Sequence, residues 1–166
     1  MRNLNASHIQ PEFFDFLVAG YAMDHRGFHG RAHWLRVLEN GRMLAAAEGA
    51  NLKVVELFAV IHDSKRENED WDEYHGARAA EHARKLRGTW FDLTDSEMAL
   101  LEYACEQHSN GLLGADITVQ CCWDADRLDL GRVGIYPDSL RLCTETARSP
   151  FVIEMAYQNS LGVTAS

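Results

Sequence analysis

The stretch "NLKVVELFAVIHD", residues 51–63, sets a strongly apolar segment directly before a His-Asp pair. Apolar and aromatic positions in it recur at spacings of three and four, which puts them on one side of a helix. They are Leu52, Val55, Phe58, Ala59 and His62. Asn51 is a suitable N-cap, because its side chain can accept from the first free backbone N–H groups. The pattern predicts a central buried helix that ends at His62 and Asp63.

Similar helical patterns flank this segment on both sides. Further helices are expected over residues 10–22, 29–49, 71–87, 94–108, about 116–131 and about 150–161. Thr94 or Asp95 is the expected cap of the helix at 94–108. The β-branched run "ITV", residues 117–119, leaves a short strand as an alternative there. Twelve Gly and three Pro in the whole chain favour helices over strands joined by tight turns. The predicted fold is an all-α bundle of about six or seven helices around a central metal site.

The length of 166 residues, 46% of them hydrophobic, suits one buried core. We therefore expect a single domain over residues 1–166, with a ligand-bearing core at 29–134. A closing helix at about 150–161 either completes the bundle or forms a contact in a homo-oligomer. The chain has no repeat and no phosphate-binding glycine motif, so function must come from side chains lining the bundle.

The formal charge of −9 argues against general nucleic-acid binding, which needs a Lys- and Arg-rich surface. No apolar run of 18 residues occurs, and the first residues lack the hydrophobic region of a signal peptide. A soluble cytoplasmic protein without membrane contact is expected. The four Cys form no CxxC pair and are interpreted as buried free thiols.

Histidines and aspartates recur on successive predicted helices, each beside apolar positions. They are His33, His62, Asp63, His75, His108 and Asp124. Neutral imidazoles and ionised carboxylates from several elements are what divalent metals need. A carboxylate can bridge two ions where an imidazole cannot, so Asp63 is the expected bridge. Taken singly, each has a simpler interpretation: a lone His is often hydrogen-bonded in a core, and Asp124 could pair with Arg127.

The ordered set resembles a known superfamily. "HWLRV" (33–37), "HDSKR" (62–66), "HGARAA" (75–80), "CEQH" (105–108) and "DADRLDLGRVG" (124–134) together look like the HD-domain metal-dependent phosphohydrolases. The resemblance implies that His33, His62, Asp63 and Asp124 hold a first metal. It implies a second site completed by His75 and His108. One or two divalent ions, Mg, Mn, Co, Ni or Fe, are then expected, and the substrate is a small phosphorylated molecule such as a nucleotide or dinucleoside polyphosphate.

The residues after the His-Asp pair depart from the HD-Ile-Gly-Lys of many relatives, since Arg66 stands in the place of the Lys. Its planar guanidinium suits phosphate, so Arg66 is expected to stabilise phosphoryl charge. The run "KRENED", residues 65–70, is either a solvated loop or a lid that carries Lys65, Arg66 and Asn68 over the phosphate. His29 is expected to face the substrate, or to form an HxxxH metal pair with His33. Asp126 and Asp129 are expected to be structural, and His82 to be solvated.

Together these features predict phosphoester hydrolysis by metal-activated water. Asp63 would orient that water or bridge the ions, and Arg66 would stabilise the transition state. Two alternatives use the same residues. One is a di-iron oxygenase, which needs His75 and His108, and the other is a non-catalytic metal- or nucleotide-binding module.

Overall fold

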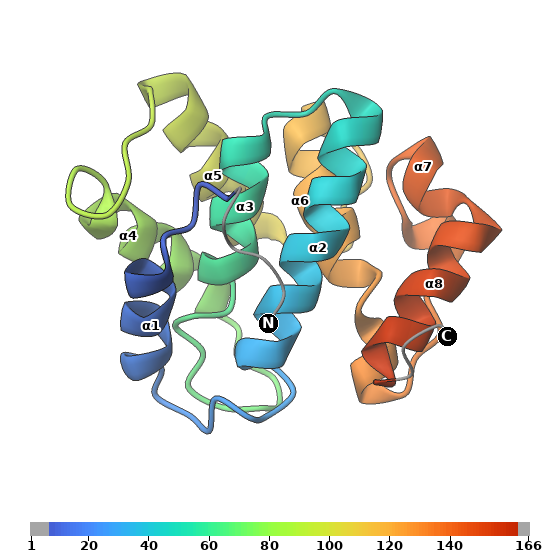
Figure 1. Ribbon diagram of the computed structural model, residues 1–166, viewed down its shortest axis with the longest axis horizontal. Helices are drawn as coiled ribbons and strands as arrows, with labels where there is room; N and C mark the ends of the chain where they lie inside the picture. Colours follow the sequence, from blue (N-terminus) through green and yellow to red (C-terminus); the bar gives the residue numbers. More distant parts are fainter. Residues whose placement is uncertain (1–6, 163–166) are drawn as a thin grey trace.

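The computed structural model describes residues 7–162, which form eight α-helices (Figure 1). The helices are α1 (Pro11–Ala19), α2 (Arg31–Glu48), α3 (Leu52–Ile61), α4 (His75–Leu86), α5 (Asp95–Gln107), α6 (Ile117–Arg127), α7 (Glu145–Arg148) and α8 (Pro150–Ser160). Two short 3-10 helices, η2 (Leu130–Val133) and η3 (Ser139–Arg141), lie between α6 and α7. Residues 1–6 and 163–166 of the predicted domain lie outside the described part.

The prediction of an all-α fold is confirmed, because residues 7–162 contain no strand beyond one isolated bridge, Arg87 to Phe91. Each predicted helical segment contains a helix, and "ITV" is the first turn of α6 rather than a strand. Three ends differ by three or more residues. The first helix stops at Ala19, α4 begins only at His75, and α6 stops at Arg127, after which the chain tightens into η2. The four-residue α7 was not predicted, because one turn leaves no apolar period in the sequence.

Local capping explains where two central helices begin. The Asn51 side chain accepts from the Val54 N–H at 3.2 Å, which fixes the start of α3 as predicted. At α5 the cap is Thr94 rather than Asp95. Its hydroxyl accepts from the Glu97 N–H at 3.2 Å, while Glu97 accepts from the Thr94 N–H at 2.9 Å. This reciprocal pair is a capping box, which satisfies two backbone donors at once.

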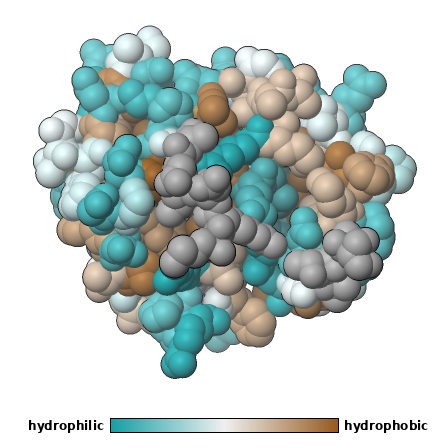
Figure 2. All heavy atoms as spheres, in the orientation of Figure 1, coloured by the Kyte–Doolittle hydropathy of each residue, from teal (hydrophilic) through white to brown (hydrophobic). Residues whose placement is uncertain are grey.

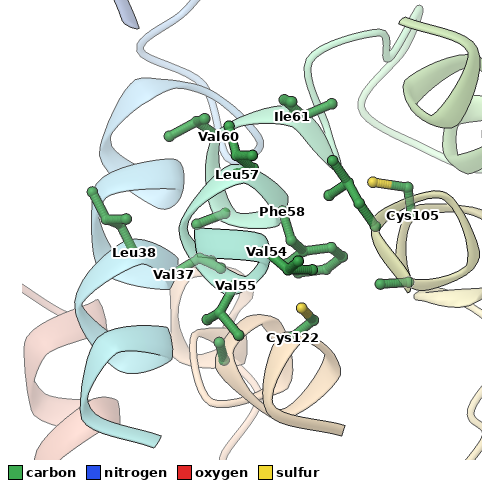
Figure 3. Packing of buried hydrophobic residues seen from close by; sticks show 14 of the residues in the cluster. Val37, Leu38, Val54, Val55, Leu57, Phe58, Val60, Ile61, Cys105 and Cys122 are labelled. Atoms are coloured by element: carbon green, nitrogen blue, oxygen red, sulfur yellow. The ribbon is translucent and has the colours of Figure 1, made fainter. Parts of the chain in front are cut away.

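Helix α3 is the centre of the core, with every residue from 54 to 61 buried. It packs against α2, α5 and α6, and Figure 3 shows its apolar side chains between these neighbours. A Cβ at Gly41 would approach Val55 Cγ1 to 2.6 Å, so glycine allows the close crossing of α2 and α3. Because α3 is buried on all sides, the residues that follow its last turn, His62 and Asp63, are buried too.

Helix α8 lies on one side of the bundle, within the segment 150–161 where a helix was predicted. It packs against η2 and α2 and lies beside α7 (Figure 1). A side chain at Gly131 in η2 would run into Ser160 and Tyr157, so glycine allows η2 to rest directly on α8. This contact matters for the site, because η2 and the segment after it form one wall of the main pocket.

The face of the molecule seen in Figure 2 mixes hydrophilic residues with hydrophobic ones. Such mixing is ordinary for a folded chain. Within residues 7–162, the helices are too short or too polar to cross a membrane.

Candidate metal centre

Four imidazoles meet at the ends of four helices. His33 lies in the first turn of α2, His62 follows α3, His75 opens α4 and His108 follows α5. The Nε2 atoms of His33 and His62 are 3.1 Å apart, and those of His75 and His108 are 2.9 Å apart. All four side chains are buried or nearly so. The histidines predicted for both metal sites are therefore brought together as two pairs.

The Nδ1 atoms of these rings are already occupied. His62 Nδ1 lies 3.1 Å from the Phe58 and Ala59 carbonyls, and His108 Nδ1 lies 2.6 Å from the Cys105 carbonyl. His75 Nδ1 contacts the Asp72 carbonyl in the same way. A carbonyl only accepts, so we place the proton on Nδ1 in these three rings. Their Nε2 lone pairs then point into the shared space.

The Nδ1 atom of His33, the fourth imidazole, is also occupied, but by a carboxylate rather than a carbonyl. It lies 2.6 Å from Asp129 Oδ2. Asp129 also accepts from Arg36 Nε at 2.6 Å, so it is held in place from two sides. A carboxylate behind an imidazole fixes its tautomer and orientation, as is usual around metal-binding histidines. The prediction that Asp129 is structural agrees with this geometry.

Asp63 lies between the two pairs and offers one oxygen to each. Its Oδ2 is 3.4 Å from His33 Nε2 and 3.5 Å from His62 Nε2. Its Oδ1 is 3.5 Å from His75 Nε2 and 3.4 Å from His108 Nε2. This Oδ1 is buried and has no hydrogen-bond donor among the described residues. Buried carboxylate oxygens need a partner, and converging imidazole lone pairs are the donors that a divalent cation uses. The residues present therefore fit a metal.

Asp126, rather than Asp124, is the second carboxylate of this cluster. Asp126 Oδ1 lies 3.3 Å from His33 Nε2 and 3.6 Å from His62 Nε2, and the three atoms could hold one ion. The prediction that Asp124 belongs to the cluster is wrong. Its carboxylate accepts from the Cys143 N–H at 2.7 Å and from the Thr144 N–H and hydroxyl, each at 2.8 Å. Asp126, which was predicted to be structural, instead lies against His33 and His62.

The electrostatics of the cluster favour a positive charge in it. Burial opposes ionisation of Asp63, but the imidazoles of His62, His108 and His33 outweigh it and hold the pKa of that carboxyl well below its usual range. Burial also opposes the charged form of His62, yet Asp63 and Asp126 raise the pKa of its imidazole to about 10. The site therefore stabilises a bound cation, either a proton or a metal ion.

A pocket of about 730 Å³ opens onto this cluster. Asp63, His75, His108 and Asp126 form its floor, and four arginines line it: Arg66, Arg127, Arg132 and Arg141. Three carboxylates, those of Asp63, Asp126 and Asp138, also line it, so the guanidinium groups exceed the acidic groups by one in a chain whose formal charge is −9. Such a lining suits an anionic ligand.

Two of these arginines approach the cluster in similar ways. Arg66 donates from Nε to the Asn68 carbonyl at 3.2 Å and from Nη2 to the Asp70 carbonyl at 2.8 Å. Its Nη1 lies 3.8 Å from Asp63 Oδ1. Arg66 therefore lines the pocket beside the cluster, where the sequence predicted a phosphate contact.

Arg132 is the counterpart on the other side, and sequence reasoning missed it. Its Nε donates to the Phe28 carbonyl and its Nη1 to the Asp129 carbonyl, each at 2.9 Å. Its Nη2 lies 3.9 Å from Asp126 Oδ1. Both arginines are nearly buried, with two nitrogens fixed by backbone carbonyls and the third directed toward a carboxylate of the cluster.

Of the other two residues predicted to contact the substrate, His29 lies in the pocket and Lys65 does not. His29 lines the pocket, and its Nδ1 lies 2.5 Å from Glu69 Oε2. Its ring centroid is 6.4 Å from that of His33, and His29 is not part of either group of candidate metal ligands. Lys65 does not line the pocket, and its carbonyl accepts from Arg78 Nε at 3.0 Å.

Two further histidines lie outside the pocket. His82 is half-buried rather than solvated as predicted, with Nδ1 3.2 Å from Ser64 Oγ. His25 is exposed, and its carbonyl accepts from the Arg31 N–H at the start of α2.

The fold is that of the HD superfamily. The crystal structure of a predicted HD superfamily hydrolase from an uncultured Thermotogales bacterium superposes on this chain with a TM-score of 0.70 and 28% sequence identity. The superposition covers 96% of this chain and 91% of that protein. Comparisons with protein-family models and with curated proteins found no match. The HD-domain resemblance predicted from the motifs is confirmed at the level of the fold.

Proposed function

We propose that this chain is a metal-dependent phosphohydrolase that acts on a small phosphoester, such as a nucleotide or a dinucleoside polyphosphate. One observation carries the proposal: Asp63 offers one oxygen to each of two imidazole pairs, at the floor of an arginine-lined pocket. The HD-domain fold and the hydrolase description of the similar structure support a hydrolase of this general kind.

The first metal would be held by His33, His62, Asp63 and Asp126, and the second by His75, His108 and the other oxygen of Asp63. Mixed imidazole and carboxylate donors suit Mn, Fe, Co or Ni, and Mg is accepted by the carboxylates. A divalent cation bound there supplies two things, polarisation of a phosphoryl oxygen and a lowered pKa of a water molecule.

Arg66 and Arg132 would bind the phosphoryl oxygens from two sides. Each guanidinium is held by two backbone carbonyls, so its remaining nitrogen is oriented before substrate arrives. Donors fixed in advance stabilise developing charge without a reorganisation cost at the moment of reaction. Charge-assisted hydrogen bonds of this type are among the strongest that proteins make.

His29 would contact the substrate at the rim of the pocket. Its Nδ1 is engaged by Glu69, which accepts a hydrogen bond and so fixes both tautomer and ring orientation. Nε2 is then the unprotonated ring atom, which can accept a hydrogen bond from the substrate. The contact also ties the loop before α2 to the loop before α4 across the mouth of the site.

The proposal is tested by metal analysis of protein purified without added metal, followed by phosphoester and nucleotide assays with Mg, Mn, Co, Ni and Fe. Asp63→Ala should abolish turnover while helical content, measured by circular dichroism, is retained. Asp92→Asn, which changes an exposed carboxylate, should leave activity unchanged. Phosphatase activity that survives in Asp63→Ala would overturn the proposal.

A di-iron oxygenase is the second candidate, and the pairing of His75 with His108 favours it, since a one-metal enzyme does not need that pair. Tight iron binding with dioxygen consumption would support it. Turnover of a phosphoester with Mn under anaerobic conditions would exclude it as the main activity. A non-catalytic module would instead show ligand-dependent thermal stabilisation without turnover.

A further inference from the structure

The main pocket is much larger than a phosphate group needs. Its volume of about 730 Å³ lies within the range of roughly 300–1,000 Å³ that is typical of sites for whole organic ligands. Besides the metal cluster and the arginines, its lining includes several apolar residues from the segment 130–142. Leu130, Ile135, Tyr136, Pro137 and Leu142 form this part, here called the apolar wall.

Two residues of the apolar wall are unusually exposed for their type. Ile135 is 52% exposed and Tyr136 is 51% exposed, although both line the pocket. Exposed apolar side chains gathered at the edge of a pocket mark surface that a ligand covers. Aromatic rings in such a position offer a large, rigid contact face.

The apolar wall is held rigidly in place. The Tyr136 hydroxyl donates to Glu154 Oε2 at 2.8 Å, and the ring centroids of Tyr136 and Tyr157 are 4.8 Å apart. Glu154 and Tyr157 both belong to α8. At the other end of the segment, Asp124 binds the backbone of Cys143 and Thr144. The wall is therefore fixed to α8 on one side and to α6 on the other, so its exposure is a feature of the fold rather than of a loose loop.

We propose that the apolar wall binds an aromatic or otherwise apolar organic group of the phosphoester, with Ile135 and Tyr136 as the residues that determine specificity. The proposal rests on the proposed function, because it places the phosphoryl group at the metal cluster between Arg66 and Arg132. The substrate class is then an aryl or nucleoside phosphate. Inorganic polyphosphate and small hydroxyl-rich phosphates would leave the wall uncovered.

Leu140 provides a matched control. It belongs to the same segment and is more exposed, at 79%, but it does not line the pocket. Replacing it removes a comparable amount of exposed apolar surface without changing the wall.

The test uses two non-hydrolysable probes, phenylphosphonate and methylphosphonate, which share a head group. Their affinities for the Mn-loaded protein are measured by calorimetry. Burying one ring against the wall should make phenylphosphonate bind about tenfold more tightly. Tyr136→Ala should reduce this ratio to about twofold while leaving methylphosphonate affinity unchanged. Leu140→Ala should keep the full ratio, and Tyr136→Phe should keep most of it.

The outcomes separate this inference from the proposed function. Equal binding of the two probes by the unaltered protein, or an unchanged ratio in Tyr136→Ala, would overturn the inference alone. An intact ratio in a protein that hydrolyses no phosphoester would support the inference and overturn the proposed function. Absence of binding of both probes would overturn both. Unchanged methylphosphonate affinity in Tyr136→Ala shows that the variant is folded.

Discussion

Asp124 and Asp126 lie two residues apart on α6, yet their carboxylates serve different parts of the protein. Asp126 Oδ1 is 3.3 Å from His33 Nε2, whereas Asp124 binds the backbone of Cys143 and Thr144. Successive helical residues are rotated by about 100°, so positions i and i+2 point to nearly opposite sides. Asp126 belongs to the metal cluster, and Asp124 fastens the pocket wall to the bundle.

This division predicts opposite phenotypes for two equal substitutions. Asp126→Asn should lower metal content and activity with little loss of stability, because a carboxylate among imidazoles is replaced without removing a structural hydrogen bond. Asp124→Asn should keep metal content but lower the free energy of unfolding by about 1–3 kcal/mol, since a buried acceptor loses part of its three donors. Metal analysis and urea unfolding of both variants measure this. Equal metal loss in the two would contradict the assignment.

Arg132 should matter for turnover as much as Arg66. Arg132→Gln removes the nitrogen that faces the cluster, and we expect kcat/KM to fall about tenfold to a hundredfold. Arg127 is the control within the same pocket, because among the described residues its guanidinium contacts the Arg141 and Leu112 carbonyls and the Trp123 ring rather than a carboxylate of the cluster. Arg127→Gln should reduce kcat/KM per folded molecule by less than about threefold. The assignment of Arg132 fails if the two variants lose activity equally.

The helices were predictable because periodicity and caps act locally. Helix α3 combines an Asn51 cap with a mostly apolar run, interrupted only by Lys53 and Glu56, and the structure has both the cap and the helix. The His-Asp pair could be placed at the end of that helix for the same reason. What sequence periodicity does not provide is how one helix is rotated against its neighbours.

That rotation decides which acid of "DADRLD" faces the cluster, and the choice of Asp124 was wrong. A signal was present: Val119, Cys122 and Asp126 recur at spacings of three and four, and Val119 and Cys122 are core residues. Asp126 continues that buried stripe. Arg132 had no such signal, since its position depends on η2 and on a carbonyl about a hundred residues away in sequence.

The crossing of α2 and α3 should not tolerate a side chain at Gly41. Gly41→Ala would press its Cβ against Val55 Cγ1, and overpacking of this kind costs about 1–3 kcal/mol of unfolding free energy. Val55→Ala in the same chain should relieve part of that cost. Gly114→Ala is the control, because nothing lies within 4 Å of its Cβ, and it should be neutral or slightly stabilising. Additive effects of Gly41→Ala and Val55→Ala in urea unfolding would argue against this contact.

His82 should make the fold sensitive to mild acid. Burial, together with Lys65 and Lys85, lowers the pKa of its imidazole to about 4. The folded state thus favours the neutral ring, so this contribution to stability is present above the unfolded pKa of about 6.5 and declines as the pH falls toward 4. His82→Gln, which cannot take up a proton, should lose less stability than the unaltered protein between pH 7 and pH 5. Urea unfolding at both pH values measures it, and equal losses would contradict the pKa assignment.

The two histidine pairs should differ in their effect on metal stoichiometry. If each pair holds one ion, His75→Ala should reduce the content from two ions per chain to one, and His33→Ala should remove the ion at the other pair. Because Asp63 contributes to both, Asp63→Ala should abolish both. Bound metal stabilises by mass action, about 2.7 kcal/mol at a hundredfold excess over Kd, so a chelator should lower Tm less in His75→Ala than in the unaltered protein. One ion per chain in the unaltered protein, unchanged in His75→Ala, would show that His75 and His108 hold no second metal.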